Sequence, residues 1–308
     1  MMIRLGLPYM GSKRKHAKKL MDQMLILKPD SKYFYDLFGG GGAMSMEALR
    51  RGLVVKYYEL NQKPVNLLRY IFSRKESGKY GFFPNEWYDF VSREKFLELK
   101  NDDTPYGAMV NLCYSFGNNG KTYLFSKKNE EIKHLAHNIV VFKCEKSRLA
   151  LSDKLGFDVI LSGCESVSGR RSDLMAQMRK NKFRCDLQQL QQLQQLQQLE
   201  QLEQLQQLAI NKITFTCQDY RKFRLETPEN ESIIYLDPPY RGTAEYEKKT
   251  VEKDIDSFFE SLPSRSFMSE YAAPFECILE IKTRSTLAKC SNKTERVERL
   301  FINRRDDV

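Results

Sequence analysis

The chain has 308 residues, of which 50 are lysine or arginine and 40 are aspartate or glutamate, so its formal net charge is +10 at pH 7. This length is sufficient for one catalytic domain with a smaller inserted domain, and the positive charge suits a polyanionic partner. No apolar run reaches the ~18 residues of a membrane-spanning helix, and the charged amino-terminal segment shows no apolar core with a cleavage site. We therefore expect a cytoplasmic protein without a membrane span.

Cysteine and histidine usage predicts neither a disulfide framework nor a metal site. The seven cysteines are scattered and form no Cys-x-x-Cys pair, which is typical of reduced, mostly buried thiols. The three histidines do not make a metal-ligand set. His134 and His137 lie three residues apart, which we interpret as the surface face of a helix.

The first predicted element is an amphipathic helix formed by the basic run 13–19 and the apolar run 20–27. Lys13 follows a Gly-Ser pair, so its ammonium group is a candidate to point at a cofactor or a phosphate. The alternative is a solvated lysine at a helix start.

A strand, a glycine turn and a helix follow in succession. The aromatic run 33–38 predicts a strand, residues 39–42 are consecutive glycines, and residues 43–49 predict a helix. Glycines allow a tight turn and a close approach to a ligand, and a helix start offers unpaired N–H groups to an anionic group. The spacing of the dinucleotide-binding fingerprint is absent, and a plain tight connection is the alternative.

The next apolar run, 53–58, predicts a second strand that ends in Glu59. An acidic residue at this point, about twenty residues after the glycine turn, is where nucleoside-binding α/β folds hold a ribose diol. The alternative is a surface glutamate at a strand end.

Residues 74–210 interrupt the strand pattern. Within them, segment 111–125 mixes aromatic residues, amides, glycines and a lysine. Asparagine can bond adenine through two hydrogen bonds, and lysine can contact phosphate or guanine, so this segment is a candidate for DNA contact. An ordinary Asn-Asn-Gly turn is the alternative.

Residues 187–208 carry a leucine at every third position, separated by glutamine and glutamate pairs. These residue types favour a helix, but a period of three makes the leucines drift around the helix instead of forming one stripe. We interpret the repeat as a spacer helix that ends the insertion. A self-association helix is the alternative.

The most informative feature comes after the repeat. The apolar run 232–236 predicts a buried strand, and Asp237, Pro238, Pro239 and Tyr240 follow it directly. Neither proline can donate to a sheet ladder, so the strand ends in a rigid shelf that carries a carboxylate, carbonyl groups and a flat ring. This set suits a planar substrate with an amino group, and an ordinary strand-end turn is the alternative.

These features occur in the order found in Dam-like adenine-specific DNA methyltransferases, and the chain resembles the phage and restriction-modification branch of that family. The resemblance rests on residues 8–13, the glycine loop 36–41, Glu59, residues 215–220 and the motif that begins at Asp237. It covers the first seventy or so residues and roughly the last hundred. The aspartate at the head of the motif favours adenine, because cytosine-methylating relatives usually carry serine there.

The resemblance implies a doubly wound, Rossmann-like α/β fold with an inserted, mainly helical target-recognition region. The catalytic domain is expected at residues 1–73 and 211–308, the recognition region at 74–186 and the repeat helix at 187–208. The implied reaction transfers a methyl group from S-adenosylmethionine to the exocyclic amine of a flipped adenine in duplex DNA, without a metal.

The resemblance also implies roles for single residues. The catalytic residues are Asp237, Pro238, Pro239 and Tyr240. The cofactor-binding residues are Tyr9, Lys13, Asp36, Phe38, Gly39, Gly41, Glu59, Asp219 and Asp237. The phage branch carries a similar aromatic Gly-Asn-Asn-Gly-Lys element, which implies DNA contacts by Asn118, Asn119, Lys121 and Tyr123.

The expected partner is double-stranded DNA, a cognate restriction endonuclease is a candidate second partner, and the expected state is a monomer in the cytoplasm of a bacterial or phage-infected host. Two other functions stay open. One is amino methylation of cytosine, RNA or a protein amide. The other is DNA binding by a relative that has lost catalysis, against which the glycine loop, Glu59 and Asp237 argue.

Overall fold

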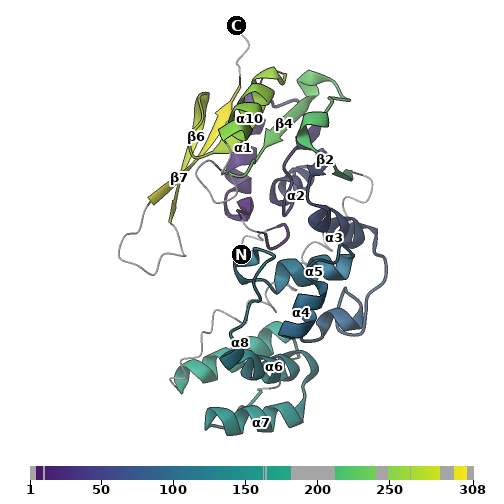
Figure 1. Ribbon diagram of the computed structural model, residues 1–308, viewed down its shortest axis with the longest axis vertical. Helices are drawn as coiled ribbons and strands as arrows, with labels where there is room; N and C mark the ends of the chain where they lie inside the picture. Colours follow the sequence, from purple (N-terminus) through teal and green to yellow (C-terminus); the bar gives the residue numbers. More distant parts are fainter. Residues whose placement is uncertain are drawn as a thin grey trace. The chain divides into compact units, whose positions relative to one another are not determined.

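The computed structural model describes residues 5–9, 11–161, 163, 165–181, 212–240, 249–263, 265–284 and 295–303. The chain forms two compact units, Met1–Ser73 with Gln204–Val308 and Arg74–Glu203 (Figure 1). The Leu/Gln repeat expected to be helical at 187–208 lies outside the described residues.

The first unit is built on a seven-stranded sheet with strand order β3-β2-β1-β4-β5-β7-β6. Neighbouring strands from β3 to β5 are parallel, and β7 is antiparallel to both β5 and β6. The mixed α/β fold predicted from the sequence is confirmed. The strands are β1 (Tyr33–Asp36), β2 (Val54–Glu59), β3 (Ile213–Cys217), β4 (Ser232–Leu236), β5 (Phe267–Glu270), β6 (Glu276–Arg284) and β7 (Glu295–Ile302).

Strands β1 and β4 lie side by side in the middle of the sheet, with a strand on each side of the pair. Their mainly apolar residues suit this position, because central parallel strands are covered on both faces. All five residues of β4 are buried. Tyr35 of β1 and Leu236 of β4 belong to one apolar cluster with Phe259 of helix α10 (Lys249–Ser261). This core fixes the ends of both central strands, where Asp36 and Asp237 lie.

The amino-terminal helix differs from its prediction. A short 3-10 helix η1 (Lys13–Lys15) comes first, and α1 (Ala17–Leu27) begins only after His16. The buried residues of α1 are Ala17, Leu20, Met21 and Met24, a helical spacing that gives one apolar face. Because of this break, Lys13 lies in η1 and not in α1. Its side chain is buried and is not part of a solvated helix start.

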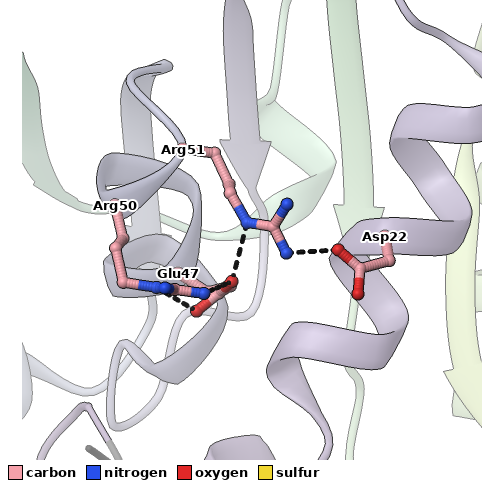
Figure 2. A network of polar contacts seen from close by, with 4 residues as sticks. All are labelled: Asp22, Glu47, Arg50 and Arg51. Carbon is pink, nitrogen blue, oxygen red and sulfur yellow. Dashed lines mark hydrogen bonds and ion pairs between the residues drawn. The ribbon is translucent and has the colours of Figure 1, made fainter.

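A polar network joins α1 to α2 (Ala43–Arg50). Glu47 accepts hydrogen bonds from Arg50 Nη2 at 2.6 Å and from Arg51 Nε at 2.9 Å, and Arg51 also pairs with Asp22 of α1 (Figure 2). The Glu47 side chain is nearly buried, so its pair with Arg51 is screened less than a pair between two exposed side chains. The network therefore connects the helix that follows the glycine turn with the helix that follows Lys13.

The order of the strands creates one switch point in the sheet. Strand β1 pairs with β2 on one side and with β4 on the other, and Asp36 at its end aligns with Tyr235, two residues before Asp237. In doubly wound sheets, ligands bind at the carboxyl ends of the strands where the order reverses. The glycine turn after β1 and the motif after β4 therefore meet at this place.

The described part of the second unit is mainly helical. Its helices are α4 (Arg93–Leu99), α5 (Pro105–Cys113), α6 (Lys127–Phe142), α7 (Glu145–Leu155) and α8 (Val167–Lys180), with the 3-10 turns η2 (Asn85–Tyr88) and η3 (Phe116–Asn118). Side-chain caps explain several starts. Ser92 accepts from Lys95 N at 3.2 Å and Thr104 accepts from Gly107 N at 3.1 Å.

One expectation about a residue of this unit is wrong, and another, about the thiols of both units, is not met by the described cysteines. His137 is not on a surface face, because its ring is buried and Nε2 lies 2.6 Å from the Tyr88 carbonyl oxygen. Burial lowers the pKa of His137 to about 4, so the ring is neutral at pH 7. The thiols are also less buried than expected, since of the four described cysteines only Cys113 is buried.

Candidate active site

Three carboxylates lie at the carboxyl ends of the central strands. Asp36 ends β1, Glu59 ends β2, and Asp237 follows β4. The pKa of each is raised, and burial is the largest cause in every case. Perturbed carboxyl groups at a switch point are typical of a functional site.

The glycine turn packs too tightly for any other residue. Gly40 and Gly42 have φ of +48° and +73°, which favour glycine. A Cβ on Gly39 would lie 2.1 Å from the Tyr57 ring, and a Cβ on Gly41 would lie 2.9 Å from the Leu7 carbonyl oxygen. The turn therefore presents bare backbone at the end of β1.

Glu59 holds this turn in place. Its Oε2 accepts a hydrogen bond from Gly40 N at 2.8 Å, its Oε1 accepts one from Asn61 N at 2.8 Å, and the Tyr57 hydroxyl donates to the Gly40 carbonyl at 2.8 Å. The carboxylate is thus oriented beside the glycine backbone. This is the position at which a ribose diol is bound in related folds.

Asp36 is buried and accepts a hydrogen bond from Ser45 Oγ of α2 at 2.7 Å. Burial raises its pKa to about 7, the Ser45 hydrogen bond opposes the rise, and the charges of Asp237 and Glu59 add to it. The site therefore concentrates negative charge that a cationic ligand would neutralise.

This charge makes the stability of the ligand-free protein depend on pH. The folded-state pKa of Asp36 lies above its ordinary value of 3.8, so the folded state binds more protons between these values, and the Asp36 contribution to stability falls as pH rises from about 4 to about 7. We expect Asp36→Asn to lose less unfolding free energy than the wild type between pH 5 and pH 8 in urea titrations. The control is Asp30→Asn, an exposed position. Equal losses in all three proteins would contradict this assignment.

Asp237 is tied to the amino-terminal segment. Lys13 Nζ donates to Asp237 Oδ1 at 2.6 Å and lies 3.4 Å from Glu298 Oε1 on β7. Burial raises the pKa of Asp237 to about 6, with the Lys13 charge opposing and the Glu298 charge adding to the rise. Burial lowers the pKa of Lys13, but the two carboxylates outweigh it, so the net shift is upward and the ammonium stays charged.

Tyr240 is held on three sides. Its hydroxyl donates to Glu298 Oε1, the Lys13 ammonium lies 4.5 Å from the ring centroid, and Tyr271 packs edge-on at 4.5 Å. Burial raises the pKa of the Tyr240 phenol, so the hydroxyl remains a donor. Between Asp237 and Tyr240, Pro238 is buried and Pro239 is exposed.

The other residues expected at the cofactor lie around the same turn, with one difference. Tyr9 lies beside Gly40, whose added Cβ would meet Tyr9 Cε1 at 3.1 Å, and Phe38 packs on Tyr220 at 5.0 Å. The Asp219 carboxylate bonds Arg221 N and Nε, both at 2.9 Å, and so caps the 3-10 helix Tyr220–Lys222. The hydrogen bond from Arg221 lowers the pKa of Asp219. The Asp219 side chain therefore stabilises the local 3-10 turn in this structure.

In the second unit, the expected DNA-contacting loop is held together from within. Asn118 Nδ2 donates to the Leu112 carbonyl at 2.7 Å, and Asn119 Oδ1 accepts from Lys121 N at 2.8 Å. Tyr123 is buried, and its hydroxyl donates to the Val91 carbonyl at 2.6 Å. Of the four expected residues, Lys121 has the exposed side chain.

Glu298, Tyr271 and Ser45 contact the site but were not expected there from the sequence. Alternation along β7 places Glu298 on the same strand face as Leu300 and Ile302, so a charged residue on an apolar face was the available signal. Ser45 is a serine inside a buried helix segment. No signal in the sequence marks Tyr271.

The chain matches the family model of D12 class N6 adenine-specific DNA methyltransferases over residues 9–277. The chain belongs to this family. The matched range contains the glycine turn, all three carboxylates and the motif from Asp237 to Tyr240. The residues of the site therefore lie in the part of the chain that matches the D12 family. No curated protein matches the chain.

Membership makes the protein an adenine-specific DNA methyltransferase, and enzymes of the D12 class use S-adenosylmethionine as methyl donor. The site fits this cofactor on chemical grounds. Glu59 suits a ribose diol, and crowded carboxylates suit a ligand with ammonium and sulfonium charges. Among the described residues, no helix combines the length and apolar character that a membrane crossing requires.

Proposed function

We propose that this D12 methyltransferase methylates the exocyclic amine of an adenine that is flipped out of duplex DNA at a specific sequence. The observation that carries the proposal is the placement of Asp237 and Tyr240 directly after β4, beside the glycine turn that follows β1. A base that enters there meets a carboxylate, a proline carbonyl and an aromatic ring in one place.

S-adenosylmethionine supplies a methyl group that its sulfonium already activates, so the protein must mainly position the amine. The adenine amine is a poor nucleophile because its lone pair is delocalised into the ring. Hydrogen bonds from its two protons to Asp237 and the Pro238 carbonyl would favour lone-pair density on nitrogen. Asp237 accepts best as a carboxylate, which its pKa of about 6 allows at neutral pH.

Tyr240 would hold the base by stacking, which is worth about 1–3 kcal/mol per base. Its ring is already fixed by Lys13, Tyr271 and Glu298 before any base arrives. Fixing the ring in advance reduces the ordering cost of binding. Glu59, with the Gly40 backbone, would hold the ribose of the cofactor.

We propose that the recognition region expected at residues 74–186, within the second unit, reads the DNA site, with Lys121 as a phosphate or guanine contact. The turn geometry supports this role, because Gly117, Asn118 and Gly120 all have positive φ and leave the Lys121 side chain exposed. Asn118, Asn119 and Tyr123 would shape this loop through their internal hydrogen bonds.

Lys121→Ala is expected to weaken DNA binding and to reduce the slope of log affinity against log salt by about one, since one phosphate contact is lost. Fluorescence anisotropy with a labelled duplex at several salt concentrations measures both. The control is Lys154→Ala on α7, where the ammonium pairs with Glu131 at 3.0 Å. A salt slope that is the same in the wild type and both variants would remove Lys121 from the DNA interface.

Expression in a host that lacks adenine methylation, followed by single-molecule sequencing of its genomic DNA, tests the proposed function. We expect N6-methyladenine at nearly every copy of one short sequence. N4-methylcytosine, or adenine methylation without a sequence preference, would contradict the proposal.

A further inference from the structure

Glu298 is a glutamate on a buried strand face. Only 6% of its surface is exposed, and it lies on β7, beyond the residues that match the family model. Burying a carboxylate costs free energy unless it is paired. Its Oε1 has two partners, the Lys13 ammonium at 3.4 Å and the Tyr240 hydroxyl. One carboxylate thus reaches both the amino-terminal segment and the catalytic motif.

The same ammonium is shared by two carboxylates. Lys13 lies 2.6 Å from Asp237 and 3.4 Å from Glu298, so an adenine amine that bonds Asp237 has to compete with Lys13. Glu298 is the second acceptor to which Lys13 can move when that competition begins. The move is short, because both acceptors already lie within ion-pair distance of Lys13.

Other charged or titratable groups also face this cluster. Asp237 interacts electrostatically with Lys13, Glu298, Asp36 and Tyr240, and with Tyr235, which precedes it by two residues on β4. Glu298 faces Lys13, Tyr240, Tyr235 and His16, and burial lowers the pKa of His16. His16 is therefore largely neutral near pH 7, which leaves Lys13 as the cation between the two carboxylates.

Resting on the proposed function, we propose that Glu298 is a positioning residue for adenine methylation. Its carboxylate draws the Lys13 ammonium away from Asp237 when the adenine amine arrives, and it fixes the Tyr240 ring through the phenolic hydroxyl. Burial is the main cause that raises the pKa of Asp237 to about 6, and the nearby negative charge of Glu298 adds to the rise. Glu298 touches neither the base nor the methyl group in this role.

Glu298→Gln keeps the shape and removes the charge, so it separates this role from packing. Lys13 is then left with Asp237 as its charged partner, and we expect kcat/KM for DNA at pH 8 to fall about 10-fold. Loss of the Glu298 charge lowers the pKa of Asp237, so the acid limb of the pH profile moves to lower pH. With a wild-type pKa of about 6, roughly a quarter of Asp237 is ionised at pH 5.5, so the ratio of variant to wild-type activity should be about 2- to 4-fold higher at pH 5.5 than at pH 8.

Tyr240→Phe keeps the ring and removes the hydroxyl that Glu298 holds. Glu298→Ala removes the acceptor of this bond altogether, so if the bond fixes the ring, adding Tyr240→Phe to Glu298→Ala should lower kcat by less than about 3-fold beyond Glu298→Ala alone. The control is Glu280→Gln on β6, an exposed residue that pairs with Arg299 at 2.7 Å. We expect its pH profile to match that of the wild type.

An unchanged acid limb in Glu298→Gln, with cofactor binding intact, would overturn the inference and leave the proposed function standing. A wild type that methylates no adenine would overturn both. If Glu298→Gln fails to bind S-adenosylmethionine, the Tyr240→Phe variant tests the inference instead. An unchanged kcat in Tyr240→Phe would then overturn the positioning role of Glu298.

Discussion

Asp237→Asn is expected to lower kcat for adenine methylation by roughly 10²- to 10³-fold, the loss typical of removing one preorganised hydrogen-bonding group from an active site. The amide keeps the size of the side chain but presents one acceptor and a competing N–H donor, and it removes the charge that holds Lys13 at 2.6 Å. Single-turnover methylation with saturating S-adenosylmethionine measures the rate. Calorimetric titration of the cofactor measures its binding on the same preparation, and we expect that affinity to fall by no more than about 10-fold.

The matched control is Asp254→Asn, the same substitution at an exposed position of α10 in the same unit. Its rate should equal that of the wild type. Retained activity in Asp237→Asn would show that the carboxylate is not an acceptor for the amine. Simultaneous loss of rate and cofactor binding would instead assign Asp237 to the cofactor alone.

Glu59→Ala is expected to raise the dissociation constant for S-adenosylmethionine by about 10- to 100-fold, because a hydrogen bond to a charged group contributes about 1.5–3 kcal/mol. The substitution removes two effects together. It deletes the acceptor proposed for the ribose diol, and it leaves Gly40 N, now 2.8 Å from Glu59 Oε2, without that partner. Equilibrium binding of the labelled cofactor measures the affinity.

Two further proteins make this result specific. Glu226→Ala, an exposed acid in the same unit, should bind the cofactor as the wild type does. S-adenosylhomocysteine lacks the sulfonium charge but keeps the ribose, so Glu59→Ala should weaken its binding to the same extent. Unchanged affinity for both ligands would remove Glu59 from the cofactor site.

Much of the site could be predicted because parallel strands bring their carboxyl ends together. Once the runs 33–38, 53–58 and 232–236 are recognised as strands, Asp36, Glu59 and Asp237 must lie at one edge of the sheet. The glycine turn could be predicted for a similar reason, since strand, turn and helix are local in sequence.

Side-chain partners far apart in sequence could not be predicted in this way. Lys13 and Asp237 are 224 positions apart, and nothing local distinguishes a lysine that binds phosphate from one that pairs with a buried carboxylate. The position of Glu298 near the site depends on which strand pairs with β5. That strand is β7, which runs antiparallel to β5. Tyr123 and His137 are buried, and their polar atoms are satisfied by the backbone carbonyls of Val91 and Tyr88, which the sequence does not reveal.

Adenine methylation of DNA is tested most directly by methyl transfer by the purified protein from methyl-labelled S-adenosylmethionine to unmethylated duplex DNA, followed by digestion to nucleosides. RNA of the same sequence and the Asp237→Asn variant are assayed in parallel. We expect label in N6-methyladenine from DNA with the wild type, and little label from RNA or from the variant. Label in N4-methylcytosine, label in RNA alone, or equal label with Asp237→Asn would contradict this expectation.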